Sequence, residues 1–471
     1  MSLGARDVSW LSIAVALAIG GCVVETGPVL GDAPNGPSPV GVAPLPSPDQ
    51  LAWQTQELGA FVHFGMNTFT NKETSDGTDP ATVFNPGSLD AGQWMTTLQN
   101  AGFRQAMLTA KPDDGFCLWP SRCTTYSVAA SSWRGGAGDV VAEFVNAAHA
   151  ANIRVGLALS PLDFHEPSSG TPAYQAFLEC QLTELLTNYG AIDEIWLWRD
   201  PGAPDLDWAA LHDLAHRLQP HTLVDVGNIA ASTGADLRSV PGQPTDQTSV
   251  QPDPANSAGS PIWYPPEAVS SIRPSWYWHA TEDTQVKTLS ELMTTYVDSV
   301  GHNSLMRLDV PPNTQGLFAD PDVAVLNQLG AALSDLYRTN VAAGRPVTAD
   351  SVFDNAPVHA AAMIVDGKLD TYWAAAQGTT SARLEVDLGG EQTFNVVNLQ
   401  EPIALGERTT EHHLEAEVNG VWTTIATGTT IGERQLYLVG TVTATRIALA
   451  ITKTRGAPAI AEIGVYQYAV P

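Results

Sequence analysis

The segment of the chain best suited to catalysis is an acidic turn that follows a short apolar run. Residues 192–198 predict a buried strand, and Asp200 stands in the turn that follows it. Side chains of a strand alternate between its two faces, so Trp196, Trp198 and Asp200 share one face if the strand extends that far. A carboxylate held in this way can act as a nucleophile. The alternative is an acidic turn residue that only caps the next helix.

The segments around Asp200 predict an α/β barrel. Residues 174–189 carry leucines at helical spacing, and residues 207–218 form a second helical pattern. Helix, buried strand, acidic turn and helix make one step of a barrel that places its chemistry at the carboxyl ends of its strands. We therefore expect a (β/α)8-type TIM barrel with Asp200 at its active-site end.

The rest of the chain predicts this barrel followed by a C-terminal β-sandwich. Roughly seven strand candidates precede the hinge at 339–346, so closure of the barrel does not follow from the pattern alone. Residues 231–260 are mostly polar and predict a long irregular loop. Short β-type runs between Gly, Thr and Asn turns then predict the sandwich. The predicted domains are 49–338 and 347–470; the predicted barrel strands are 59–64, 103–110, 153–159, 192–198, 222–226, 275–279 and 304–310; the predicted helices are 89–101, 139–151, 174–189, 207–218, 285–300 and 323–337.

Composition excludes some partners. The 471 residues include 50 acidic and 22 basic side chains, for a formal net charge of −28. Such a surface repels phosphate backbones, so we expect no nucleic-acid partner.

The first residues resemble an export signal. Arg6 gives a weak basic start, residues 10–19 are apolar, and residues 19–22 resemble a lipoprotein cleavage box that ends at Cys22. We expect export, either with a lipid on Cys22 as a membrane tether or as a secreted protein; a misassigned start or a plain anchor is the alternative. Residues 23–48 are rich in Pro and Gly and predict a semi-rigid linker.

Three further cysteines remain. Cys117 and Cys123 are close enough for a small disulfide loop, which an exported protein can keep oxidised. Cys180 lies in a predicted helix, where we expect a buried free thiol. No Cys/His spacing indicates a zinc site, and no metal is expected.

Several motifs resemble the bacterial α-L-fucosidases of glycoside hydrolase family 29. The likeness covers most of residues 50–338, and the tail resembles the discoidin-like sandwich often appended to these enzymes. The matching stretches are 59–70 (GAFVHFGMNTFT), 114–121 (DGFCLWPS), 181–190 (QLTELLTNYG), 263–267 (WYPPE) with 271–274 and 276–279, 299–301 with Asn303, 311–313 with 316–317, and in the tail 364–367 and 370–373.

The resemblance implies a retaining glycosidase that needs no cofactor. Such an enzyme uses two carboxyl groups about 5–5.5 Å apart, one as nucleophile and one as acid/base. The family nucleophile follows the fourth strand. One alignment puts it on Trp198, which cannot attack, and an alignment shifted by two residues puts it on Asp200. Glu267 is the acid/base candidate.

The resemblance also gives candidate sugar contacts. His63, Glu73, Trp119 and Trp198 match the family pattern or lie beside it, each with a structural alternative in the core or a loop. Asp113 stands where the family has a sugar-contacting histidine; both histidines of that motif are gone. An aromatic after the third strand and a Glu after the fifth are also replaced, by Leu162 and by Ile229.

Three functions remain open at this point. The first is an exported α-L-fucosidase acting on glycans with terminal fucose. The second is a catalytically inactive carbohydrate-binding relative, and the third is a glycosidase for another sugar. In the tail, Tyr372 and Trp373 are a candidate sugar platform, with a core role as the alternative, and Asp366 with Asp370 a candidate calcium loop.

Overall fold

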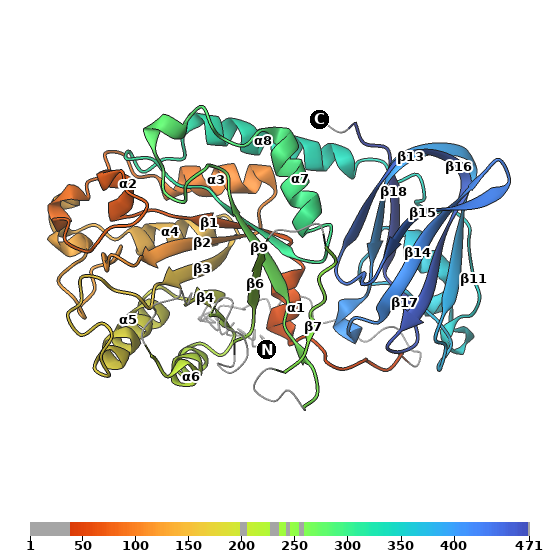
Figure 1. Ribbon diagram of the computed structural model, residues 1–471, viewed down its shortest axis with the longest axis horizontal. Helices are drawn as coiled ribbons and strands as arrows, with labels where there is room; N and C mark the ends of the chain where they lie inside the picture. The colour runs from red at the N-terminus through yellow and green to blue at the C-terminus, as the bar shows by residue number, and fades with distance from the viewer. Residues whose placement is uncertain (1–37, 198–204, 227–234, 242–244, 254–258, 470–471) are drawn as a thin grey trace, which may run out of the picture.

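The computed structural model describes residues 38–469 except for 198–204, 227–234, 242–244 and 254–258. Two parts lie side by side, an α/β barrel and an antiparallel β domain (Figure 1). Among the residues described, no helix combines the length and the apolar character that crossing a bilayer requires.

A parallel sheet of eight strands forms the barrel. A single bridge between Asp225 and Leu237 nearly closes it by joining the two outermost strands. The expected TIM-barrel fold is therefore confirmed. In sheet order the strands are β5 (Leu223–Asp225), β4 (Glu194–Trp196), β3 (Arg154–Leu159), β2 (Gln105–Lys111), β1 (Leu58–Val62), β10 (Leu305–Asp309), β9 (Pro266–Ser271) and β6 (Arg238–Pro241).

Helices surround the sheet, as Figure 1 shows. Several begin at a side chain that accepts a hydrogen bond from the first turn, for example Asp90, Asp139 and Asp207, and Thr288 forms a capping box with Glu291. The helices are α1 (Pro48–Gln54), α2 (Met66–Thr70), α3 (Ala91–Ala101), α4 (Val140–Ala150), α5 (Tyr174–Asn188), α6 (Trp208–Leu218), α7 (Leu289–Ser299) and α8 (Asp320–Leu336).

Two strands differ from the sequence prediction. Residues 275–279 form a loop, not a strand, and the strand lies earlier, at β9. Residues 231–260 include β6 and the short strand β7 (Val250–Gln251), which pairs with β8 (Ile262–Trp263) just after them. Both barrel strands carry polar residues toward the barrel interior, such as Ser239 and Glu267, so an apolar pattern does not reveal them.

Helix α1 plugs the amino-terminal end of the barrel. Trp53 is 1% exposed and packs on Leu223, Leu237 and Leu305, which lie at or just before the start of their strands. Its indole N–H donates to Glu194 Oε2 at 2.8 Å. Solvent is thereby kept from this end of the barrel interior.

The second part is an antiparallel β domain with its own apolar core, as expected. Trp373 is completely buried in that core and donates from Nε1 to the Ser351 carbonyl, so it is not a sugar platform. The main sheet contains β11 (Val347–Ala349), β13 (Ala382–Gln400), β16 (Gln435–Thr454), β14 (Thr409–Val418) and β15 (Val421–Gly428), with β18 (Glu462–Tyr466) on β13; β12 (Trp373–Ala374) pairs with β17 (Ala459–Ile460).

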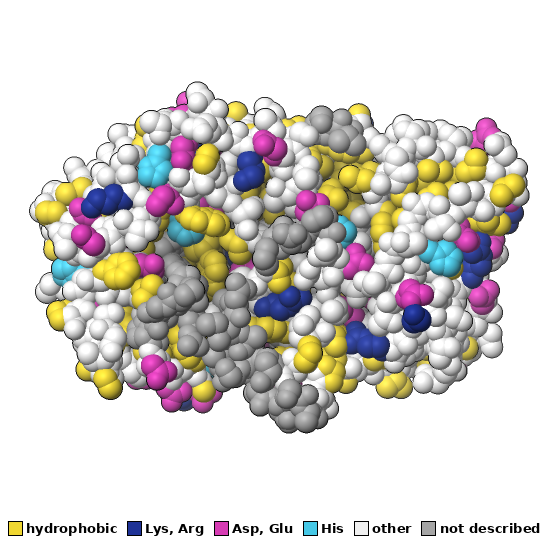
Figure 2. Space-filling model, viewed as in Figure 1, with side chains coloured by type: hydrophobic (Ala, Val, Ile, Leu, Met, Phe, Trp, Pro, Cys, Tyr) yellow, Lys and Arg dark blue, Asp and Glu magenta, His cyan; other side chains and the backbone are white. Residues whose placement is uncertain are grey.

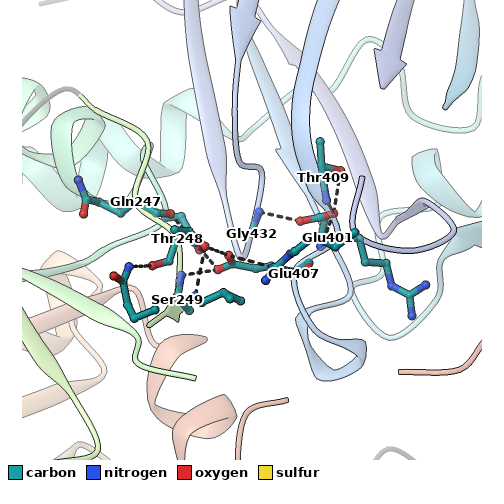
Figure 3. A network of polar contacts seen from close by, with 12 residues as sticks. Gln247, Thr248, Ser249, Glu401, Glu407, Thr409 and Gly432 are labelled. Atoms are coloured by element: carbon teal, nitrogen blue, oxygen red, sulfur yellow. Dashed lines mark hydrogen bonds and ion pairs between the residues drawn. The ribbon is translucent and has the colours of Figure 1, made fainter. Parts of the chain in front are cut away.

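A buried carboxylate joins the two parts (Figure 3). Glu407 of the β domain accepts hydrogen bonds from the Thr248 hydroxyl, the Ser249 N–H and the Asn303 amide of the barrel part, at 2.5, 2.8 and 2.8 Å. Gly432 packs so closely that a Cβ there would lie 2.2 Å from the Asn303 amide. The first described residues also dock here, since the Val42 N–H donates to the Leu405 carbonyl at 2.8 Å.

Candidate active site

Polar side chains gather at the carboxyl ends of the barrel strands. His63 follows β1 and Asp113 follows β2, whereas Ser271 and Asp309 end β9 and β10. Because the strands are parallel, these residues share one end of the barrel, opposite the plug made by α1. Figure 2 shows hydrophobic side chains around a hollow in the barrel part of the face in view.

His63 is fixed by a buried acid. Its Nδ1 atom lies 2.8 Å from Asp309 Oδ1, and its backbone N–H donates to the same oxygen at 3.2 Å. The Ser271 hydroxyl donates to the other Asp309 oxygen at 3.3 Å. Burial raises the pKa of Asp309, although His63 opposes that shift. The imidazole is therefore oriented, with Nε2 left as the ring nitrogen that a bound hydroxyl can reach.

Glu73 positions an exposed indole next to His63. Its carboxylate accepts the backbone N–H groups of Trp276 and Tyr277 and contacts Nε2 of His279, each at 3.0 Å. Trp276 is 41% exposed, and its ring centroid lies 5.6 Å from that of His63. A large exposed aromatic face beside oriented polar groups suits the C–H face and the hydroxyls of a sugar.

Trp276 is a site residue that the sequence analysis missed. The signal was the aromatic run 276–279, which resembled the family but was assigned to a strand. In the structure it forms a loop, and loop residues of barrels carry function.

Asp113 is held by the hydroxyl of Ser160, and a buried lysine, Lys111, stands two residues before it. Lys111 Nζ lies 3.2 Å from Asp163 Oδ2 and 3.1 Å from the Tyr174 hydroxyl. Burial alone would lower the pKa of Lys111, but Tyr174 and Asp163 outweigh it and raise that pKa above its ordinary value.

Trp119 belongs to the packing of the loop after β2, not to the sugar site. It is 1% exposed, and its indole donates to Glu184 at 2.9 Å. The same loop is tied to α5 by a disulfide between Cys123 and Cys180, and Cys117 is the buried free thiol. The expected Cys117–Cys123 pair and the expected free thiol at Cys180 are therefore both wrong, because the fold brings α5 against the loop so that Cys180 faces Cys123.

Glu267 lies at the other end of the barrel. It is completely buried near the start of β9, where Arg307 Nε donates to its Oε2 at 2.8 Å and the Ser239 hydroxyl to its Oε1 at 3.2 Å. Arg307 also binds Glu194, which Trp53 covers. A carboxylate sealed in this way does not reach a sugar at the carboxyl ends, so the geometry argues against the expected acid/base role.

Strand β4 ends before the nucleophile position. Trp196, its last residue, is 8% exposed and packs in the barrel interior, with its ring centroid 4.9 Å from that of Phe61. Trp198 and Asp200 lie outside the described residues, as does Cys22. The structure thus brings His63, Glu73 and Asp113 to one end of the barrel, and it separates Trp119 and Glu267 from them.

Sequence comparisons match both parts of the chain to known families. A family model described as alpha-L-fucosidase matches residues 53–335, and one for the F5/8 type C domain matches residues 346–463. The chain is 37% identical to alpha-L-fucosidase 1 of Arabidopsis thaliana over 452 residues, which cover 92% of this chain and 89% of that protein.

A comparison with solved structures also matches the chain to a fucosidase. The structure of a fucosidase of glycoside hydrolase family 29 from Ruminococcus gnavus, in complex with fucose, superposes with a TM-score of 0.84 at 30% identity. The match covers 92% of this chain and 97% of that one.

Proposed function

The chain belongs to the α-L-fucosidase family of glycoside hydrolases, and we propose that it acts on terminal α-L-fucosyl groups of glycans at the carboxyl ends of its barrel strands. One observation carries the location: the exposed indole of Trp276 stands beside the oriented imidazole of His63. In this proposal Trp276 stacks on the sugar and His63 Nε2 binds a hydroxyl. Glu73 holds Trp276 in place, and Asp113 accepts a further hydroxyl.

For hydrolysis we assign the attacking role to Asp200. A retaining mechanism also needs an acid/base about 5–5.5 Å from the nucleophile. Glu267 is sealed at the opposite end, and Glu73 is engaged by Trp276, Tyr277 and His279.

The sequence supports a second candidate, a fucose-binding protein without turnover, because the family's histidine pair and one of its glutamates are replaced. In this reading the barrel keeps His63 and Trp276 for recognition, and the fourth-strand turn has lost its attacking group. Family membership alone does not decide between the two, because function depends on the site and not on the fold.

One experiment separates the candidates. Release of nitrophenol from a nitrophenyl α-L-fucoside is measured for the wild type and Asp200→Asn, and fucose binding by calorimetry for both. Turnover that Asp200→Asn abolishes while binding persists supports the hydrolase. Fucose binding without turnover supports the second candidate, and neither turnover nor binding rejects both.

The aromatic contact has its own control. Trp276→Ala should weaken fucose binding at least tenfold, because stacked aromatic contact is lost at little cost to the fold. Leu438→Ala, at a site 55% exposed on the β domain, should leave it unchanged. Equal binding by both variants would contradict the placement of the sugar.

Export with a lipid tether on Cys22 is a further part of the proposal. The Cys123–Cys180 disulfide supports an oxidising compartment. Metabolic labelling with palmitate in the native host tests it: label on the wild type but not on Cys22→Ala is expected, and unlabelled protein in the medium would favour simple secretion.

A further inference from the structure

Two histidines and one aspartate meet outside the barrel, away from the sugar site. His212 and His216 stand four residues apart on α6, a spacing that puts both on one face of a helix. Asp236 comes from the segment just before the strand β6 and faces them. Among the residues described, these three form the group whose ligand atoms are close enough to hold one metal ion.

Their ligand atoms form a nearly regular triangle. His216 Nε2 lies 3.1 Å from His212 Nε2 and 3.2 Å from Asp236 Oδ2, and the third edge, from His212 Nε2 to Asp236 Oδ2, is 3.6 Å. Tetrahedral zinc with bonds of about 2.0–2.2 Å separates its ligand atoms by roughly 3.3–3.6 Å. The longest edge, 3.6 Å, falls within that range, and the other two, 3.1 and 3.2 Å, lie just below it. One ion at the centre can bind all three atoms at once.

Neighbouring groups fix the ligands. The Val224 N–H donates to the same Asp236 oxygen at 2.9 Å, and Gln50 Nε2 donates to the Asp236 carbonyl at 2.9 Å. Nε2 of His216 faces both His212 and Asp236, so in the Nδ1–H tautomer its lone pair points to the place where a metal would bind.

An ion can enter from solvent. The side chains of His212, His216 and Asp236 are 19%, 30% and 21% exposed, so a fourth position is open to water. The net charge of the chain favours a cation. Two imidazoles and one carboxylate suit zinc-class transition metals, whereas magnesium and calcium prefer oxygen ligands alone.

We propose that His212, His216 and Asp236 bind one divalent transition-metal ion of the zinc class. The ion joins α6 to the seam at which the barrel closes, since Leu237, the next residue, makes the bridge to Asp225. Its role is structural: the site lies outside the barrel, so it does not depend on the proposed fucosidase function. The spacing of His212 and His216 is a ligand pattern that the sequence analysis did not identify.

The test uses the full chain without a histidine tag, freed of metal by a chelator. Titration with Zn²⁺ in a calorimeter should give one saturable equivalent, and Zn²⁺ should raise the thermal midpoint. His216→Ala should weaken binding at least tenfold and remove the thermal shift. His221→Ala is the matched control, because His221 has an 86% exposed side chain paired with Asp49 outside the triangle; it should behave as the wild type.

A spectroscopic measurement on the wild type tests the site without relying on variants that could fold poorly. Co²⁺ added to the wild type should show the visible absorption of a tetrahedral site, which Zn²⁺ then displaces. Absence of saturable Zn²⁺ binding and of the Co²⁺ spectrum in the wild type would overturn the proposal, as would equal Zn²⁺ binding by folded His216→Ala and His221→Ala.

Discussion

Nδ1 of His63 lies 2.8 Å from Oδ1 of Asp309, so one hydrogen bond links the ends of β1 and β10 at the mouth of the barrel. These strands are neighbours, with Phe61 opposite Asp309 in the register. The pair therefore has two functions: it compensates a completely buried carboxylate, and it orients the imidazole toward the sugar site.

The first prediction concerns this coupling. His63→Ala should cost about 2–4 kcal/mol of unfolding free energy, because it leaves Asp309 buried without its partner. Asp309→Asn in the same chain should recover part of that loss. Urea unfolding of both single variants and the double variant gives the coupling energy, expected at about 1–3 kcal/mol. Strictly additive losses would show that the pair is not coupled.

The second prediction tests Glu267. Glu267→Gln keeps the shape of the side chain and leaves Arg307 paired with Glu194, so stability should change by about 1 kcal/mol or less. Arg307→Met leaves two buried carboxylates without a cation and should cost about 3–5 kcal/mol or more. Fucose binding and any turnover should survive Glu267→Gln. A folded Glu267→Gln protein that binds fucose but has lost turnover would restore a catalytic role.

The third prediction concerns the disulfide. Cys123 and Cys180 are 57 residues apart in sequence, and cross-linking a loop of this length stabilises by about 2–4 kcal/mol. Cys123→Ser should lower the thermal midpoint and make it independent of reductant, whereas the wild type should respond to reductant. Cys117→Ala is the control, because Cys117 is a free thiol and its variant should keep the response.

The fourth prediction concerns pH. Burial, with a smaller effect of Glu57, raises the pKa of Glu433 to about 8. An ordinary glutamate has a pKa of about 4.3, so the folded state binds a proton between roughly pH 4.3 and 8 that the unfolded state releases. This group therefore contributes its full stability below that window and loses it as pH rises through the folded pKa.

Glu433→Gln should flatten that dependence and raise the thermal midpoint at pH 8 relative to the wild type. Glu391→Gln, an exposed glutamate of the same domain, should follow the wild type at each pH. Parallel curves for the wild type and Glu433→Gln from pH 5 to 8 would contradict the assignment.

Local periodicity predicted the regular parts of the barrel. The helices with capping residues lie within a few residues of the predicted bounds, because one apolar face is enough to identify them. The strand β9 was not predicted, because Pro266, Glu267 and Ser270 interrupt an apolar pattern. The charge of the buried Glu267 is compensated by Arg307, which is distant in sequence.

Site residues could be predicted from the sequence only where they belong to a motif of the family. His63 and Glu73 were identified from the family resemblance, but nothing local shows that Glu73 holds Trp276, some 200 residues away. The same limit explains the disulfide and Glu267. The separation of residues along the sequence does not predict which cysteine faces Cys123. Nor does it predict at which end of the barrel a carboxylate lies.

Glu407 has a consequence for how this protein can be rearranged. The barrel part supplies three hydrogen-bond donors to one carboxylate of the β domain. Excision of that domain would remove the acceptor of the Ser249 N–H and of the Asn303 amide. The two portions are thus poorly suited to exchange as independent modules. Any chimera that transplants the barrel has to bring the segment around Glu407 with it, or redesign the surface it protects.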